Sequence, residues 1–286
     1  ATSTHVLPPP AGRPSECGNC KGSVKTILDF ARAKRELQPI VVVTAYDAMM
    51  ARLVNRAGVD AILVGDSAAM VVHGFSSTVQ ATLAMLCPHV AAVRRGAPDM
   101  FIIADLPFLE ARQGVARATA AAGALMQAGA NAVKLEGLTG HEDVVTHLIG
   151  SGIPVMGHLG LTPQSVHQLG GYRIQGRSPD DAARLRQEAK SLEKMGAFAL
   201  VLECIPESLA ATITSELGIA TIGIGAGSGT GGQVLVLTDL LGLDPAFQPR
   251  FARRYLAGHE LVQAAIHQYA EDVRAGNYPA LEEVLA

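Results

Sequence analysis

The chain has 286 residues, of which 49% are hydrophobic and 17% are charged, and its formal net charge is -3. This composition is typical of a globular protein with a sizeable core. The small net charge excludes a basic field for nucleic acid or for an anionic membrane surface, and no apolar run reaches the roughly 18 residues that a membrane-spanning helix needs.

The first 22 residues, ATSTHVLPPPAGRPSECGNCKG, are rich in Pro, Gly and Ser and are expected to form a disordered arm without the apolar core of a secretory signal. Cys17 and Cys20 make a single C-x-x-C pair there, whereas a structural zinc site needs four ligands. Cys87 and Cys204 lie in apolar stretches and are expected to be buried thiols. Cysteine usage therefore favours a reducing cytoplasm over a disulfide scaffold.

From Ile40 onward, short apolar runs alternate with Ala-rich amphipathic stretches. The runs expected as strands are Ile40–Thr44, Ala61–Val64, Phe101–Asp105, Ala132–Glu136, Val155–Leu159, Ala199–Glu203, Ala220–Gly225 and Val234–Asp239. Helices are expected at Ser23–Arg35, Val79–Arg95, Val115–Gln127, Asp180–Met195, Ser208–Leu217 and Leu256–Ala275. Apolar strands separated by helices indicate a parallel sheet covered on both faces. Eight such units in about 250 residues predict a single-domain (β/α)8 TIM barrel over residues 23–286, with a doubly wound open sheet as the alternative.

Polar residues follow six consecutive strands at their carboxyl ends, where (β/α)8 enzymes carry their active sites. They are Thr44, Tyr46 and Asp47, then Asp66 and Ser67, Asp105, Lys134 and Glu136, His158, and Glu203. One polar strand end has an ordinary explanation, since Asp and Ser often cap the next helix. Six in a row, after strands whose interiors are almost purely apolar, predict a ring of polar groups at the barrel mouth.

Three carboxylates in this ring, Asp66, Asp105 and Glu136, come from neighbouring strand ends. Such a cluster is repulsive unless a proton or a cation neutralises it. Oxygen ligands favour a hard ion, and Mg²⁺ usually takes one or two carboxylates together with water and substrate oxygens. Lys134 and Glu136 are two residues apart and therefore face the same side of their strand. The alternative interpretation is that Lys134 and Glu136 form a buried ion pair with no catalytic role. His158, taken alone, is expected to have a structural role.

The glycine-rich stretch GIGAGSGTGG spans Gly223 to Gly232, and Gly227, Gly229 and Gly232 satisfy G-x-G-x-x-G. The stretch leads into a strand rather than a helix, so it does not predict a dinucleotide site. Two interpretations stay open: a turn that brings backbone amides to an anion, or a purely structural tight turn.

The segments TAYDA, LVGDS, AVRRGAP, ADLPF, GANAVKLEG, GHLGLTPQS, GGYRIQGR, LVLECIP and IGIGAG occur in this order from Thr44 to Gly227. Through them the chain resembles the ketopantoate hydroxymethyltransferase family over about residues 25–278. The resemblance implies a barrel of the isocitrate lyase and phosphoenolpyruvate mutase type. It also implies transfer of a hydroxymethyl group from 5,10-methylenetetrahydrofolate to 3-methyl-2-oxobutanoate. The product would be 2-dehydropantoate, the first committed intermediate of pantothenate biosynthesis.

The resemblance further implies roles for individual residues. Asp66 and Asp105 would hold Mg²⁺ beside the bound oxo acid, and Glu136 would support the metal. Ser67 and Lys134 would contact the oxo acid. The family further implies a large homo-oligomer, often a decamer.

Glu203 is implied as the base that deprotonates the oxo acid, with His158 in the pocket wall. The stretch ALVLECIP shows no cationic neighbour, so an apolar setting is expected to raise the pKa of Glu203. The chain departs from the family pattern at Pro88, Gly231 and Thr238 and in its tail YPALEEVLA, all outside the metal, base and oxo-acid positions. A Mg²⁺-dependent carbon–carbon lyase or mutase of the same fold, and an inactive oxo-acid-binding barrel, are the alternatives.

Overall fold

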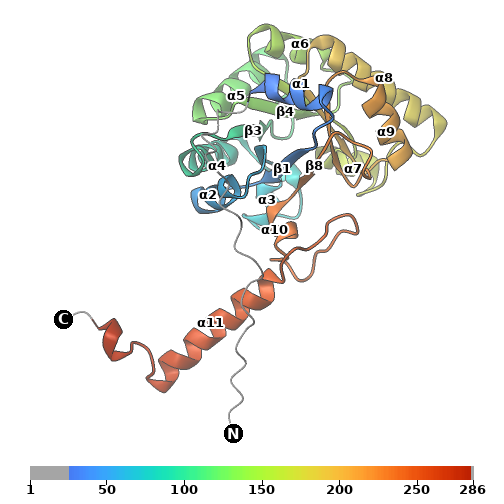
Figure 1. The fold of residues 1–286 in the computed structure, drawn as a ribbon. Coiled ribbons are helices and arrows are strands. Elements are labelled where there is room, and N and C mark those ends of the chain that lie inside the picture. The colour runs from blue at the N-terminus through green and yellow to red at the C-terminus, as the bar shows by residue number, and fades with distance from the viewer. Residues whose placement is uncertain (1–25, 285–286) are drawn as a thin grey trace.

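A computed structural model describes residues 26–284 of the chain. Its eight strands form one closed barrel in chain order, and every neighbouring pair is parallel. The predicted (β/α)8 architecture is therefore confirmed (Figure 1). The arm predicted for residues 1–22, with Cys17 and Cys20, lies outside the described residues.

The elements alternate between strand and helix as the apolar pattern predicts. The strands are β1 Ile40–Thr44, β2 Ala61–Val64, β3 Phe101–Asp105, β4 Ala132–Glu136, β5 Val155–Gly160, β6 Ala199–Glu203, β7 Ala220–Ile224 and β8 Gly232–Leu235. The α-helices are α1 Ile27–Arg35, α2 Ala48–Arg56, α3 Ala68–Val71, α4 Leu83–Gly96, α5 Val115–Ala128, α6 Glu142–Gly150, α7 Val166–Leu169, α8 Pro179–Met195, α9 Glu207–Glu216, α10 Leu237–Leu240 and α11 Gly258–Ala275. Short 3₁₀ turns lie at η1 Thr78–Gln80, η2 Pro163–Ser165 and η3 Leu281–Glu283.

Two predicted boundaries are wrong by several residues. The eighth strand was expected at Val234–Asp239, but the strand ends at Leu235 and the chain turns into α10, where the backbone amide of Leu237 donates to the side chain of Thr44. The helix expected from Val79 begins at Leu83, because Thr82 caps it by accepting a hydrogen bond from the Met85 amide. In both places a side-chain contact ends or starts the element.

The strands alternate between two apolar layers, as the two-residue period of a strand requires. Ile62 and Val64 of β2 belong to the large cluster between the strands and the surrounding helices, whereas Ala61 and Leu63 belong to a smaller cluster. The smaller cluster fills the barrel interior, and Phe30 of α1 belongs to it. We call the part of this cluster nearest α1 the floor.

Three aromatic rings form the floor. Phe30 of α1 has its ring centroid 5.2 Å from those of Phe101 and Phe198, at the amino-terminal ends of β3 and β6. Such tilted and edge-on contacts are the favoured arrangements of aromatic rings. Helix α1 therefore closes the amino-terminal end of the barrel, and access to the interior is from the opposite end.

The glycine-rich stretch between β7 and β8 descends from the mouth of the barrel to its floor without forming a helix. Gly229 packs so closely on α9 that an added Cβ would lie 2.7 Å from the Cβ of Ala211. At Gly232 an added Cβ would lie 2.3 Å from the carbonyl oxygen of Ile40. The glycines are thus needed for close packing, which supports the structural interpretation of this stretch over the anion-binding one.

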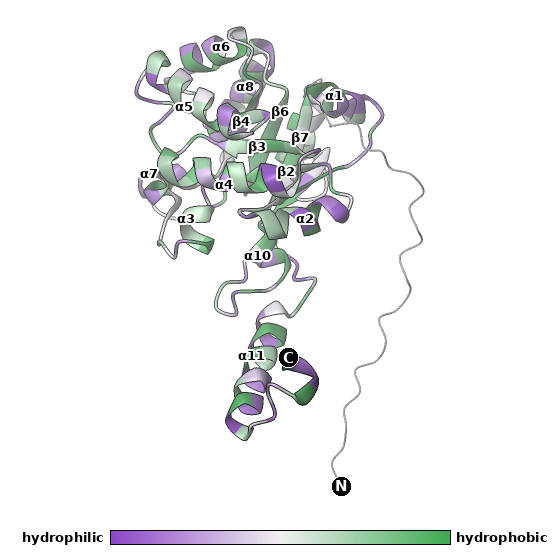
Figure 2. Cartoon of the chain, turned by 90° about the vertical axis from the view of Figure 1, so that its left-hand side faces the viewer, coloured by the Kyte–Doolittle hydropathy of each residue, from purple (hydrophilic) through white to green (hydrophobic). Residues whose placement is uncertain are grey.

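Helix α11 extends away from the barrel instead of packing on it (Figures 1 and 2). Within it only Gly258 is buried. Val262, Ile266, Tyr269 and Val273 recur at intervals of three and four residues, which places them on one helix face, and each is about half exposed. The described residues contain no helix that is both long enough and apolar enough to cross a bilayer.

Candidate active site

The register of the parallel strands brings the predicted polar residues together in pairs. Asp105 of β3 lies beside Lys134 of β4. Glu136 of β4 lies beside His158 of β5, whose final residue Gly160 lies beside Glu203 of β6. Partners in register point to the same face of the sheet, which here is the barrel interior.

The first group consists of Asp66, Asp105 and Lys134, all buried. The Nζ atom of Lys134 lies 3.0 Å from Oδ1 of Asp105, and the backbone amide of Asp66 donates to Oδ2 of Asp105 at 3.0 Å. Burial alone would lower the pKa of Lys134, but the charges of Asp105, Glu136 and Asp66 raise it instead. Lys134 therefore stays charged at any physiological pH.

Among these three residues, Asp66 has the side-chain charge that its surroundings balance least. Burial raises its pKa well above the usual value, and the charges of Asp105 and Glu136 raise it further. Lys134 and a hydrogen bond from Gln164 act in the opposite direction without cancelling this effect. Asp66 is thus a carboxyl group that needs an additional cation to remain ionised.

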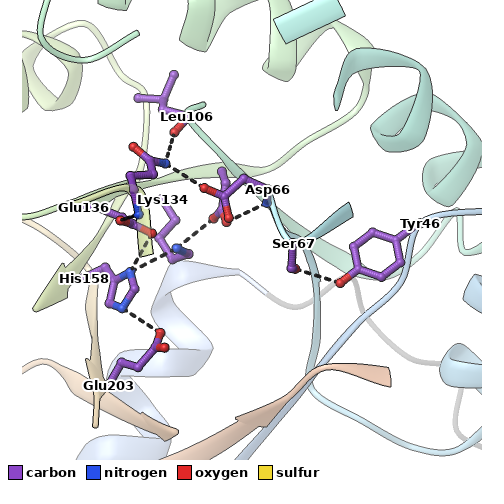
Figure 3. Close-up of polar contacts among 10 residues, drawn as sticks. Tyr46, Asp66, Ser67, Leu106, Lys134, Glu136, His158 and Glu203 are labelled. Carbon is purple, nitrogen blue, oxygen red and sulfur yellow. Dashed lines mark hydrogen bonds and ion pairs between the residues drawn. The ribbon is translucent and has the colours of Figure 1, made fainter. Parts of the chain in front are cut away.

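The second group places His158 between two glutamates, as the close-up shows (Figure 3). Its Nδ1 atom lies 3.4 Å from Oε1 of Glu136, and its Nε2 atom lies 3.1 Å from Oε2 of Glu203. Burial and the nearby Lys134 lower the pKa of His158, but its contacts with Glu136 and Glu203 outweigh them and raise it to about 9. The local sequence of β6 shows no cationic neighbour for Glu203, but β5 places His158 beside it in space.

Ser67 lies at the edge of these groups. Its Oγ atom is 2.8 Å from the hydroxyl oxygen of Tyr46, a buried side chain that follows β1 (Figure 3). An added Cβ at Gly65 would lie 2.7 Å from Oγ of Ser67 and would displace this hydroxyl from its present position. The side chain of Ser67 makes no capping hydrogen bond to α3, whereas Asp47 caps α2 through the amides of Met49 and Met50. The capping explanation thus holds for Asp47 and fails for Ser67.

Gln164, from η2 in the loop after β5, joins the site although sequence reasoning assigned it no role. Its Nε2 atom donates to Oδ2 of Asp66 at 2.8 Å and to the carbonyl oxygen of Leu106 at 3.0 Å. Its backbone amide donates to Oε2 of Glu136 at 3.0 Å. The available signal was its place inside GHLGLTPQS, one of the two nine-residue segments of the family resemblance.

The donor set fits a hard divalent cation. Asp66, Asp105 and Glu136 supply only oxygen atoms. Among the described residues, the buried Oδ1 of Asp105 has no hydrogen-bond donor and forms an ion pair with Lys134. Between residues 26 and 284, no three His, Cys, Asp or Glu side chains form a complete metal-binding group. Mg²⁺ is usually bound through one or two carboxylates and completed by water and substrate oxygens.

Solved structures share this architecture. A crystal structure of phosphonopyruvate hydrolase with oxalate and Mg²⁺ superposes with a TM-score of 0.60 at 11% sequence identity, covering 90% of this chain and 92% of that one. A structure of 2,3-dimethylmalate lyase, a member of the PEP mutase/isocitrate lyase superfamily, superposes with a TM-score of 0.58 at 18% identity and covers 91% of both chains. These structures therefore share the (β/α)8 barrel fold with this chain, which carries a cluster of carboxylates at the barrel mouth.

Sequence comparison identifies the family. The profile described as ketopantoate hydroxymethyltransferase matches residues 24–281. The 3-methyl-2-oxobutanoate hydroxymethyltransferase of Coxiella burnetii (strain CbuK_Q154) is 48% identical over 255 residues, which cover 89% of this chain and 96% of the relative. The protein of the same name from Bdellovibrio bacteriovorus is 48% identical over 260 residues, which cover 91% of this chain and 99% of the relative. The chain belongs to the ketopantoate hydroxymethyltransferase family, which confirms the resemblance read from its motifs.

Proposed function

We propose that this chain transfers a hydroxymethyl group from 5,10-methylenetetrahydrofolate to C3 of 3-methyl-2-oxobutanoate. The product is 2-dehydropantoate, so the reaction is the first committed step of pantothenate biosynthesis. One observation carries the proposal: relatives named for this activity match the chain over nearly their whole length, and the residues that the resemblance selects converge at one end of the barrel.

Asp66 and Asp105 are the residues that would hold Mg²⁺, with Glu136 beside them. A bound Mg²⁺ supplies Lewis-acid chemistry, which polarises the keto group of the oxo acid and makes its C3 proton easier to remove. Lys134 keeps its positive charge next to Asp105 and so prevents the paired aspartates from repelling the anionic substrate. Ser67, held by the Tyr46 hydroxyl, is placed to contact the carboxylate of the oxo acid.

Glu203 is the proposed base. In the proton-transfer step the C3–H bond of the oxo acid breaks and the proton passes to a carboxylate oxygen of Glu203. The electron pair left at C3 then forms a bond to the methylene carbon of the folate, and the bonds from this carbon to N5 and N10 break. A water molecule supplies the hydroxyl group of 2-dehydropantoate, and its second proton and the proton held by Glu203 pass to the two nitrogens, which leaves tetrahydrofolate. His158 lies 3.1 Å from Oε2 of Glu203 and keeps this carboxylate oriented before the transfer. Its other nitrogen faces Glu136, which fixes the ring between the two carboxylates.

Proton exchange tests this assignment without the folate. Wild-type protein with Mg²⁺ and 3-methyl-2-oxobutanoate in deuterated water should exchange the C3 proton, followed by NMR. Glu203→Gln should exchange about 10²- to 10⁴-fold more slowly, the usual contribution of a positioned base, while still binding the oxo acid. Glu207→Gln is the matched control, because this glutamate of α9 is bound to Ser228 and lies outside the site. Equal exchange rates for Glu203→Gln and wild type would move the base elsewhere, with His158 as the next candidate.

We also propose that the chain works as a homo-oligomer, a decamer as the family implies, in the cytoplasm. The half-exposed apolar face of α11 supports association, since a helix face of this kind is stable in water only when another surface covers it. Val41 on the outer side of β1 is also 46% exposed. Cys87 and Cys204 are free thiols, which suits a reducing compartment. Sedimentation of the purified protein tests the assembly, and a monomer at micromolar concentration would contradict it.

A further inference from the structure

The loop between β5 and α8, residues 161–177, crosses the mouth of the barrel, and we call it the lid. Both of its ends are attached beside β6: the Leu161 amide donates to the carbonyl oxygen of Glu203 at 2.8 Å, and the Gln175 amide donates to that of Cys204 at 2.9 Å. Between these points the lid reaches the opposite side of the barrel, where the Tyr172 hydroxyl contacts the sulfur of Met70 in α3. The lid therefore covers the site from the β5–β6 side to the β2 side.

Gln164 is the lid residue that binds the site itself. Its three hydrogen bonds reach Asp66 after β2, Leu106 after β3 and Glu136 at the end of β4. Two other polar side chains of the lid, His167 and Gln168, are exposed, and neither makes a side-chain hydrogen bond within the described part of the chain. The side chain of Gln164 thus connects the lid to the ends of β2 and β3, and its backbone amide connects the lid to the end of β4.

The chemistry of a carboxamide suits this position. Its nitrogen carries two N–H donors, and here one binds the carboxylate of Asp66 while the other binds the carbonyl oxygen of Leu106. A glutamate at this position could only accept hydrogen bonds when ionised, and a lysine would bring a positive charge next to the carboxylate that has to face a cation. Gln164 holds Oδ2 of Asp66 and forms no bond to its Oδ1, so that oxygen remains for a metal ligand bond.

We propose that Gln164 is a positioning residue: it fastens the lid over the site and fixes the orientation of Asp66 for the metal and the oxo acid. This inference rests on the proposed role of Asp66. On its other side Gln164 also lines a cavity of about 710 Å³ between the lid, α8 and the loops after β3 and β4. Opening of the lid would join this cavity to the carboxylate cluster. The hydrogen bonds of Gln164 hold the lid in the position that separates the two.

Gln164→Leu tests the proposal, because leucine has a similar size and no donor. Gln168→Leu is the matched control, since it makes the same change four residues further along the lid on an exposed side chain. Two quantities are measured besides thermal stability. The first is the rate at which trypsin cuts the metal-free protein after the exposed lid residues Arg173 and Arg177. The second is the oxo-acid concentration that half-saturates Mg²⁺-dependent C3 proton exchange.

Loss of hydrogen bonds to a charged group is expected to accelerate lid cleavage and to raise the half-saturating concentration by about 10- to 100-fold in Gln164→Leu. The maximal exchange rate should fall much less, and the melting temperature should stay near that of wild type. Gln168→Leu should resemble wild type in every measurement. A Gln164→Leu variant with wild-type cleavage and wild-type half-saturation would overturn the proposal, as would a loss confined to thermal stability.

The design separates this inference from the proposed function. The trypsin experiment contains neither Mg²⁺ nor oxo acid, so it tests the attachment of the lid alone. If wild-type protein shows no C3 exchange at all, the proposed activity fails while lid cleavage still decides the role of Gln164. If wild type exchanges normally and Gln164→Leu matches it in both assays, only the role of Gln164 is wrong.

Discussion

The floor and the mouth of the barrel occupy the same inward-facing strand positions but differ in chemistry. On β3 the inward row begins with Phe101 in the aromatic floor and ends with Asp105 in the charged cluster. On β6 a similar row runs from Ala199 to Glu203. The floor gains stability by excluding water from apolar surface, whereas the mouth concentrates four carboxylates against one lysine and one histidine. A barrel strand can therefore serve folding at one end and chemistry at the other.

The largest expected effect is at the mouth. Asp105→Asn keeps the size of the side chain but removes one of the two carboxylates proposed for Mg²⁺, and Lewis-acid stabilisation is worth several kcal/mol. We expect turnover to fall by about 10³- to 10⁴-fold, or about 4–5 kcal/mol in the activation barrier. Steady-state formation of 2-dehydropantoate at saturating Mg²⁺ measures this. The control is Asp99→Asn, an exposed aspartate two residues before β3 at the floor end, and similar losses in both variants would contradict the comparison.

At the floor, Phe30→Ala should lower the stability of the protein and leave its turnover nearly unchanged, the opposite of what is expected for Asp105→Asn. Removing a buried aromatic ring typically costs about 3–5 kcal/mol in the free energy of unfolding. Phe30 is 2% exposed and contacts two other rings, so we expect a loss within this range in urea denaturation. The kcat of the folded fraction should stay close to that of wild type. Phe247→Ala, at a 53% exposed position, should change neither quantity, and a kcat loss specific to Phe30→Ala would show that floor and mouth are coupled.

The smallest of these effects concerns pH. The pKa of His158 is raised from 6.5 to about 9, so its ion pairs stabilise the metal-free protein fully below pH 6.5, and this stabilisation disappears as the pH rises through about 9. The shift corresponds to about 3 kcal/mol at most. Between pH 6.5 and pH 9.5, wild type should therefore lose more unfolding free energy than His158→Gln in denaturant titrations. Parallel pH dependences in the two proteins would mean that His158 is neutral in the folded state.

The site could be predicted only in part from the sequence. Asp66, Asp105, Lys134, Glu136, His158 and Glu203 all follow from apolar runs that end in polar residues, because strand ends share one edge of a parallel barrel. Their pairing did not follow, and the contact between His158 and Glu203 contradicts the apolar setting expected for that glutamate. Gln164 carried no local signal of its role, since an amide in a loop is ordinary until the loop is folded over the mouth.

The sequence by itself determined the alternation of strand and helix, the set of polar strand ends and the family, because these depend on local periodicity and on contiguous motifs. The tertiary structure alone decided which of these residues touch. Closure of the barrel brings the Asp66 amide to Asp105, 39 residues away, and Gln164 to Asp66 across 98 residues. Such contacts arise from strand register and from the path of the lid. Neither is encoded in the propensities of neighbouring residues, since both depend on how distant segments bury apolar surface together.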